Sequence, residues 1–214
     1  MPVTRERVLT AAVAIADTEG IGAVTMRRLA ADLGIEAMSL YHHVSGKEDI
    51  LDGMVDVVFG EVEAPSVSDW RTALDRRARS MRAALTRHPW AIGLLESRTQ
   101  PGPATLHHHE AVLRCLREAG FSLAATGHAA ALMDACVYGF ALQEVQLPFD
   151  TAEETQELAR GIMAELPADA YPYFAEFATE RVLQPGYDFA DEFDFGLGLV
   201  LDGLERTLES EQSR

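Results

Sequence analysis

The chain has 214 residues, of which 48% are hydrophobic and 24% are charged, a balance typical of a folded globular protein rather than a disordered one. No apolar run approaches the roughly 18–20 residues that cross a bilayer, and no signal-peptide pattern follows the first residues, so we expect no membrane partner. Cys115 and Cys136 are too few for a disulfide framework and lack metal-ligand spacing. We therefore expect a cytoplasmic protein with reduced thiols, no metal and no cofactor.

The net charge of −16 argues against a nucleic-acid partner only when it is averaged over the whole chain. Residues 1–50 carry five basic side chains against seven acidic ones, so nearly all of the negative excess lies beyond residue 50. Lys47, the only lysine among the 18 basic residues, lies in this least acidic segment. The charge therefore does not exclude DNA binding by the first fifty residues.

Helical periodicity with recognisable caps covers nearly the whole chain, whereas hairpin turns and strand-like alternation are absent. Two Ser/Thr-x-x-Glu capping boxes, at Ser45–Glu48 and Thr151–Glu154, mark helix starts. The sequence therefore predicts an all-α fold. The predicted helices are 4–18, 26–33, 37–44, 45–63, 69–87, a short one near residue 90, 104–119, 122–147, 151–166, one around 174–182, and 189–208.

The stretch from Thr25 to Val44 has the pattern of a helix-turn-helix. Ala30 supplies the small residue at the helix crossing, and Gly34, four positions later, tolerates the positive φ of the turn. Apolar residues stand at the inward positions Leu29, Leu33, Ile35, Leu40 and Val44. In such a motif the second helix enters the DNA major groove and presents its exposed residues to base edges.

The expected DNA contacts fall into two groups. Ser39 can exchange hydrogen bonds with base edges, while Ala37 and Met38 can pack on a thymine methyl group. The full set expected at base edges is Ala37, Met38, Ser39 and His42. The residues expected at phosphates are Tyr41, His43 and Lys47, with Thr25 and Arg27 at the start of the first helix, where Arg27 could reach a guanine or a phosphate.

Residues 4–50 resemble the DNA-binding domain of the tetracycline-repressor (TetR) family of bacterial transcription regulators. The resemblance rests on Thr25-x-Arg-x-Leu-Ala-x-x-Leu-Gly-Ile35 and on Leu40-Tyr-His-His-Val-x-x-Lys47. Weaker landmarks resemble the family's C-terminal regulatory domain: Asp69-Trp70-Arg71, Gly120-Phe121-Ser122 and the glycine-containing run 195–205. The resemblance implies a helix-turn-helix domain over 1–50 and a larger ligand-binding and dimerisation domain over 51–214.

The family resemblance implies a homodimeric regulator, most simply a repressor, that leaves a palindromic double-stranded operator when a small-molecule inducer binds. A two-fold protein would then place its recognition helices about 34–36 Å apart, or a multiple of that. One alternative is an all-α enzyme, but the chain lacks Asp-Asp-x-x-Asp, Glu-x-x-His and Gly-Lys-Ser/Thr motifs. The other is a sensor without DNA binding, against which the retained Tyr41, His43 and Lys47 argue.

The resemblance also suggests a ligand site, although each of its residues fits an ordinary core or surface position as well. The expected ligand-binding residues are Arg77, Met81, His109, Val112, Met133 and Tyr138. At positions aligned with the magnesium–tetracycline site of the tetracycline-binding members, this chain has no histidine but Glu63, Arg77, Met81, Leu95 and Val112. We therefore expect an inducer other than tetracycline.

Two further features have competing interpretations. In the run His107-His108-His109, adjacent side chains point about 100° apart on a helix, so we expect a helix start beside the ligand site rather than a metal site, with His109 turned inward. The last helix contains Gly196, Gly198 and Gly203, which cost roughly 1 kcal/mol each relative to alanine. They indicate close backbone packing, either within the chain or, as the resemblance implies, in a four-helix dimer interface with helix 122–147.

Overall fold

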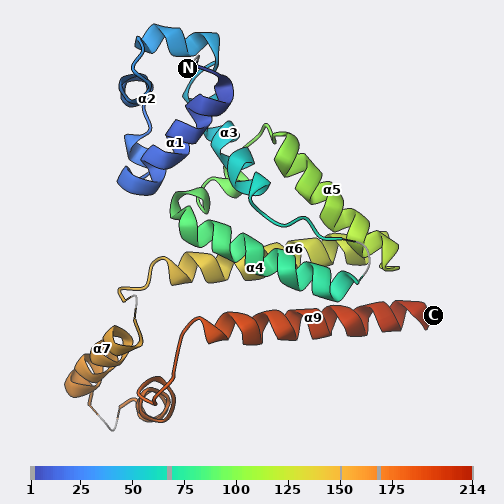
Figure 1. The fold of residues 1–214 in the computed structure, drawn as a ribbon. Coiled ribbons are helices and arrows are strands. Elements are labelled where there is room, and N and C mark those ends of the chain that lie inside the picture. The colour runs from blue at the N-terminus through green and yellow to red at the C-terminus, as the bar shows by residue number, and fades with distance from the viewer. Residues whose placement is uncertain (1–2, 67–68, 150, 168–169, 214) are drawn as a thin grey trace.

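The computed structural model describes residues 3–66, 69–149, 151–167 and 170–213, and all regular elements within them are helices (Figure 1). The all-α prediction is confirmed. Within the same residues, no helix is long and apolar enough to cross a membrane. The helices form a small N-terminal bundle, a larger body and an arm that extends from the body (Figure 1).

The N-terminal bundle consists of α1 (Arg5–Glu19), a short 3₁₀ turn at Ile21–Ala23, α2 (Met26–Leu33) and the 3₁₀ helix η2 (Ala37–His42). Thr4 and Thr25 cap α1 and α2, because their side-chain oxygens accept the backbone N–H groups of Arg7 and Arg28 at 3.3 and 3.1 Å. The bundle buries an apolar cluster that draws on all three helices, including Val8, Leu29 and Leu40 at 0% exposure.

The body contains α4 (Trp70–Arg87), α5 (Pro103–Glu118), α6 (Leu123–Glu144) and α9 (Asp191–Gln212), with short 3₁₀ turns at Pro89–Ala91 and Leu95–Ser97. α6 packs against α4, α5 and α9. The arm consists of α7 (Ala152–Glu165), α8 (Pro172–Phe177) and a π-helical turn at Ala178–Val182. The predicted Thr151–Glu154 capping box is present at the start of α7.

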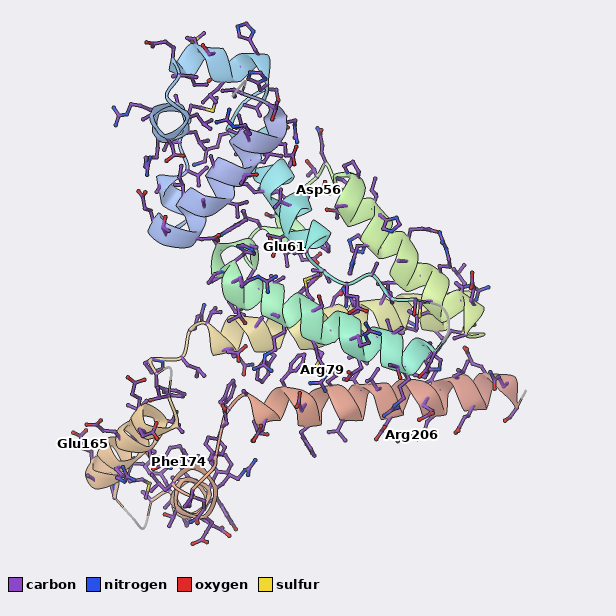
Figure 2. The ribbon with its side chains drawn as sticks, in the orientation of Figure 1. Asp56, Glu61, Arg79, Glu165, Phe174 and Arg206 are labelled. Carbon is purple, nitrogen blue, oxygen red and sulfur yellow. The ribbon has the colours of Figure 1, made fainter. Side chains whose placement is uncertain are left out.

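α3 (Lys47–Gly60) joins the bundle to the body, because its two halves belong to different apolar clusters. Ile50 and Met54 pack in the N-terminal cluster, whereas Val58 and Phe59 pack with α4, α5, α6 and α9. The expected domain boundary between residues 50 and 51 therefore falls inside a helix that both clusters share. Asp56, near the middle of α3 (Figure 2), fixes α5, since its Oδ1 accepts the backbone N–H of Thr105 at 2.8 Å.

Candidate nucleic-acid interface and ligand cavity

The helix-turn-helix is built by close contact between α2 and η2. Ala30 is 3% exposed, and its carbonyl oxygen accepts the backbone N–H of Ile35 at 3.0 Å. Gly34, the C-cap of α2, has φ 68° and ψ 35°, the left-handed conformation that glycine adopts without steric cost. Leu40 and Val44 are buried beneath η2, which turns the other side of this segment toward solvent.

The second element of the motif is a 3₁₀ helix, which corrects the predicted ordinary helix over 37–44. The backbone N–H groups of Ser39 and His43 donate to Glu36 and Leu40, three residues earlier, at 2.9 and 2.8 Å. Glu36 provides no side-chain cap for the segment. Ser, Tyr and His are only moderate α-helix formers, and so short an element adopts the tighter turn readily.

The predicted base-edge residues lie on the outer side of η2. Met38 is 74% exposed and His42 is exposed, while Ala37 and Ser39 are half-buried. Among the predicted phosphate contacts, Tyr41 is 50% exposed. Lys47 and Arg27 are exposed, His43 is half-buried, and the Thr25 side chain is engaged as the cap of α2.

The cations of the bundle differ in whether carboxylates already neutralise them. Arg5 pairs with Asp49 at 2.5 Å, and Arg28 pairs with Glu19 at 2.7 Å. Neither Arg27 nor Lys47 forms an ion pair within the described residues. These two charges are therefore available to DNA phosphates, whereas Arg28 has a structural role.

The start of α3 corrects the predicted Ser45–Glu48 capping box. α3 begins after Gly46, and Asp49 rather than Glu48 is the acceptor: its Oδ2 accepts the Ser45 backbone N–H at 2.8 Å and the Ser45 hydroxyl at 3.3 Å. Partial burial acts to raise the pKa of Asp49, but the bonds from Ser45 and Arg5 outweigh it and lower that pKa. These bonds fix the turn that leads into Lys47, the first residue of α3.

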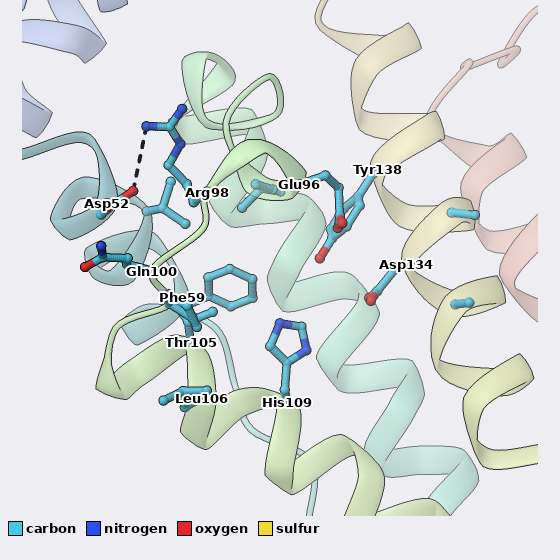
Figure 3. A pocket seen from close by; sticks show the side chains of 15 residues that line it. Asp52, Phe59, Glu96, Arg98, Gln100, Thr105, Leu106, His109, Asp134 and Tyr138 are labelled. Atoms are coloured by element: carbon cyan, nitrogen blue, oxygen red, sulfur yellow. Dashed lines mark ion pairs between the residues drawn. The ribbon is translucent and has the colours of Figure 1, made fainter. Parts of the chain in front are cut away.

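A cavity of about 620 Å³ lies between α3, the 90s loop, α5 and α6 (Figure 3). Two of the predicted ligand residues, His109 and Tyr138, line it. The other four pack in the core and are not among its lining residues: Arg77 at 1% exposure, Met81 at 0%, Val112 at 4% and Met133 at 0%. Four charged residues that no sequence pattern indicated also line the cavity, from three different segments: Asp52, Glu96, Arg98 and Asp134.

A buried polar cluster lies behind the cavity wall. Arg77 donates from Nη2 to Asp134 Oδ1 at 2.5 Å and from Nε to His108 Nε2 at 3.0 Å. His108 is 2% exposed, so the inward histidine is His108, while His109 is exposed at the cavity. Burial, followed by the Arg77 charge, lowers the pKa of His108 to about 3, so its ring is neutral and accepts from Arg77.

The neutral His108 predicts that stability falls in mild acid. Below pH 6.5 the unfolded chain protonates this ring, whereas the folded chain leaves it neutral down to about 3. The unfolded state then binds more protons, so the free energy of unfolding falls by about 1.4 kcal/mol per pH unit from this group. Lowering the pH from 7.5 to 5.5 should reduce the free energy of unfolding of wild type, measured in urea, by about 1.4 kcal/mol more than that of His108→Gln. A His42→Gln control should match wild type, and an equal pH dependence in all three proteins would contradict the assignment.

His88 joins the N-terminal bundle to the body. It is 6% exposed, with Nδ1 2.7 Å from Asp17 Oδ1 on α1 and Nε2 3.2 Å from Glu61 Oε2 just after α3. Trp90 Nε1 also donates to Asp17 Oδ1, at 2.6 Å, and Arg87 pairs with Glu61 at 2.7 Å. Burial acts to raise the pKa of Glu61, but its bonds to Arg87 and His88 lower it below the ordinary value. These bonds connect the end of α4 and the residue after α3 to α1.

No group of three or more His, Cys, Asp or Glu side chains in the described ranges could hold a metal ion.

The comparisons with known proteins fit the two regions described above. Residues 8–54 match the family model for bacterial regulatory proteins of the tetR family, and residues 64–208 match the tetracyclin repressor-like C-terminal domain. The chain belongs to the TetR family.

Named relatives support this TetR-family assignment. The HTH-type transcriptional repressor DrrR1 of Streptomyces coeruleorubidus is 38% identical over 214 residues, covering 94% of this chain and 77% of that protein. The class A tetracycline repressor from transposon 1721 in Escherichia coli is 30% identical over 203 residues, covering 93% of this chain and 89% of that protein. As a member of a family of regulators, the chain is not an enzyme.

Solved structures of TetR-family proteins share the fold. Apo ActR of Streptomyces coelicolor superposes with a TM-score of 0.81 at 27% identity and covers 99% of both chains. ActR in complex with actinorhodin superposes with a TM-score of 0.80 at 28% identity, with 95% of both chains covered. This TetR-family protein is therefore a ligand-responsive, DNA-binding transcriptional repressor.

Proposed function

We propose that two copies of this chain bind a palindromic operator in the cytoplasm and release it when a small-molecule inducer enters the cavity. Residues 1–50 would read the DNA, and residues 51–214 would bind the inducer and the second protomer. The observation that carries the proposal is the position of α3. It begins at Lys47, directly after the helix-turn-helix, and its residues Asp52, Val55 and Phe59 line the cavity.

Dimerisation through α6 and α9 is supported by their exposed apolar side chains. Leu123, Leu132 and Leu142 on α6 are 78%, 49% and 44% exposed, and Phe195 and Leu199 on α9 are 67% and 56% exposed. Solvent-facing leucine and phenylalanine residues on two packed helices are typical of a protein–protein interface.

The glycines of α9 favour the interface over close packing within the chain. A Cβ atom built at Gly196 or Gly198 would meet nothing within 4 Å, so the fold of one chain does not require glycine there. Each nevertheless costs roughly 1 kcal/mol of helical stability relative to alanine. Close approach of a partner helix accounts for that cost.

Signal transmission from the cavity to the DNA would use two contacts besides α3 itself. Arg98, in the cavity wall, pairs through Nη1 with Glu48 Oε2 at 2.8 Å and lies 3.7 Å from Asp52, and both acids are on α3. His88 ties the end of α4 to α1. A ligand that displaces these groups would change the separation of the two recognition elements, and only its differential affinity for the two states can shift the equilibrium.

The proposal is tested by a mobility-shift assay with the DNA upstream of the gene for this chain. We expect a shifted complex that contains two chains per DNA and that weakens steeply as salt rises. Ala135→Trp, which places a large side chain into the cavity, should leave this shift intact and abolish release by any inducer found in extracts. Failure to bind any DNA in this region or in a random pool would refute the proposal.

The roles within the motif predict two kinds of DNA-binding variant. Lys47→Ala should weaken binding to every sequence by about tenfold and reduce the salt dependence by about one phosphate contact. Tyr41→Ala should also weaken binding to every sequence. Ser39→Ala should instead change the preferred base at one or two positions, because a serine hydroxyl at a base edge would exchange hydrogen bonds with it.

Fluorescence anisotropy with a matched set of operator variants separates these outcomes. Arg114→Ala, which removes an exposed positive charge on α5, serves as the control and should bind like wild type. If Lys47→Ala and Arg114→Ala behave alike, Lys47 does not contact DNA.

A further inference from the structure

Among the charged groups that line the cavity, acidic side chains outnumber basic ones. Asp52, Glu96 and Asp134 contribute carboxylates, and Arg98 contributes the one guanidinium of the lining among the described residues. Arg98 is already held by Glu48 at 2.8 Å and faces Asp52 at 3.7 Å. An acidic ligand would therefore have to displace Glu48 and Asp52 to reach this cation.

The carboxylate of Asp134 is also paired, with an arginine that lies behind the cavity wall. Arg77 is 1% exposed, does not line the cavity, and binds Asp134 at 2.5 Å. The side chain of Asp134 keeps 23% exposure and faces the cavity. Glu96 has no cationic partner within the described residues. The lining thus retains uncompensated negative charge at Glu96.

Glu96 and Asp134 lie on the same side of the cavity as a phenol. Figure 3 shows Glu96, Tyr138 and Asp134 on one side of the cavity. Burial raises the pKa of Tyr138 and the charges of Asp134 and Glu96 raise it further, whereas the charge and the hydrogen bond of Arg77 act to lower it. Two carboxylate acceptors and an aromatic face are therefore grouped at one end of a drug-sized cavity.

Aromatic and apolar side chains line the part of the cavity formed by α3 and α5. The Phe59 ring, which is 4% exposed, lies 5.5 Å from the exposed His109 ring, centroid to centroid, with an angle of 51° between the two rings, and Leu106 lies on the same helix as His109. A planar ring system can pack against these side chains, while a cation beside Glu96 and Asp134 gains from the carboxylates and from the face of Tyr138. An acid in the same place would be repelled by the like charges of Asp134 and of Glu96, which is exposed to solvent.

We propose that the cavity selects a planar, apolar amine, whose protonated nitrogen lies between Glu96 and Asp134 and whose rings lie against Phe59. This inference rests on the proposed role of the cavity as the inducer site, and it adds the chemical class of the inducer. Glu96 is the residue that determines the preference for positive charge, because Asp134 is shared with Arg77 and Asp52 with Arg98.

Three probes with the same three-ring body test the charge preference. At pH 7.5, 9-aminoacridine is a cation, acridine is neutral and acridine-9-carboxylate is an anion. Fluorescence titration of the full chain without DNA, which these probes would intercalate, should give the lowest Kd for the cation, at least tenfold below that of acridine, and the highest for the anion. Equal or tighter binding of the anion, or no binding of any probe up to 1 mM, would overturn the inference.

Glu96→Gln keeps the shape of the side chain and removes its charge. We expect it to raise the Kd of 9-aminoacridine at least fivefold and to leave that of acridine within twofold. Glu153→Gln, the same change on the exposed arm helix α7, should leave both Kd values unchanged. An unaltered preference for the cation in Glu96→Gln would contradict the assigned role of Glu96.

The inferred chemistry and the proposed function can fail separately. If the amine binds as expected but no cavity ligand alters operator binding, the chemistry holds and the inducer role of the cavity fails. If acridine-9-carboxylate binds more tightly and releases the operator from wild type but not from Ala135→Trp, the inducer role holds and the amine class fails.

Discussion

Replacing Phe195 and Leu199 by aspartate should convert the protein to a monomer and weaken operator binding at least a hundredfold. Both side chains are more than half exposed on α9, so their replacement leaves the core of the single chain intact. Charges in the centre of a desolvated interface have no partner, and the interface separates. A single chain then reads one half-site and loses the contacts of the other.

Sedimentation and anisotropy measure the two consequences on the same sample. The variant should sediment as one chain of 23.4 kDa, retain the helical content of wild type and fail to bind at concentrations that saturate wild type. Leu113→Asp on α5, where the leucine is 42% exposed, is the matched control and should remain dimeric. A variant that stays dimeric would show that the dimer forms elsewhere.

Removing Asp134 should lower the free energy of unfolding by about 3 kcal/mol, because it leaves the buried guanidinium of Arg77 without its carboxylate. Arg77 is 1% exposed, and its Nη1 lacks a hydrogen-bond partner within the described residues even with Asp134 in place. Urea unfolding of Asp134→Ala at fixed protein concentration measures this loss.

The double variant Arg77→Met, Asp134→Ala distinguishes a broken ion pair from general damage to the core. It should recover more than half of the lost stability, since no charge is then left buried. Asp75→Ala, in an exposed pair with Arg79, should cost less than about 1 kcal/mol. If Asp134→Ala and Asp75→Ala cost the same, the Arg77–Asp134 pair is not the buried element described above.

The sequence predicted the elements that local patterns define. The cap Thr151 and the turn glycine Gly34 are confirmed, because each acts on neighbours within a few residues. The same reasoning did not predict which of two neighbouring acidic residues would accept the hydrogen bonds of Ser45. Asp49 and Glu48 both follow Ser45 at nearly the spacing of a cap, and the structure selects Asp49, which Arg5 also holds from α1.

The cavity could be predicted only in part, because its polar groups come from distant segments. Tyr138 and His109 were expected from the family resemblance, whereas Glu96 and Asp134 carry no local motif. The Arg77–Asp134 pair joins residues 57 positions apart, and no spacing rule connects α4 to α6 over that distance. The periodicity also could not choose between His108 and His109, since both adjacent faces of α5 are partly covered.

Selection of DNA from a random pool by the full-length protein tests the central claim most directly. If two chains read the operator through η2 and Lys47, the enriched sequences will be inverted repeats with half-site centres about 10 base pairs, or a multiple, apart. Footprinting should then show two symmetric protected segments on the same face of the duplex. Enrichment of a single unsymmetrical half-site, or no enrichment, would contradict the account.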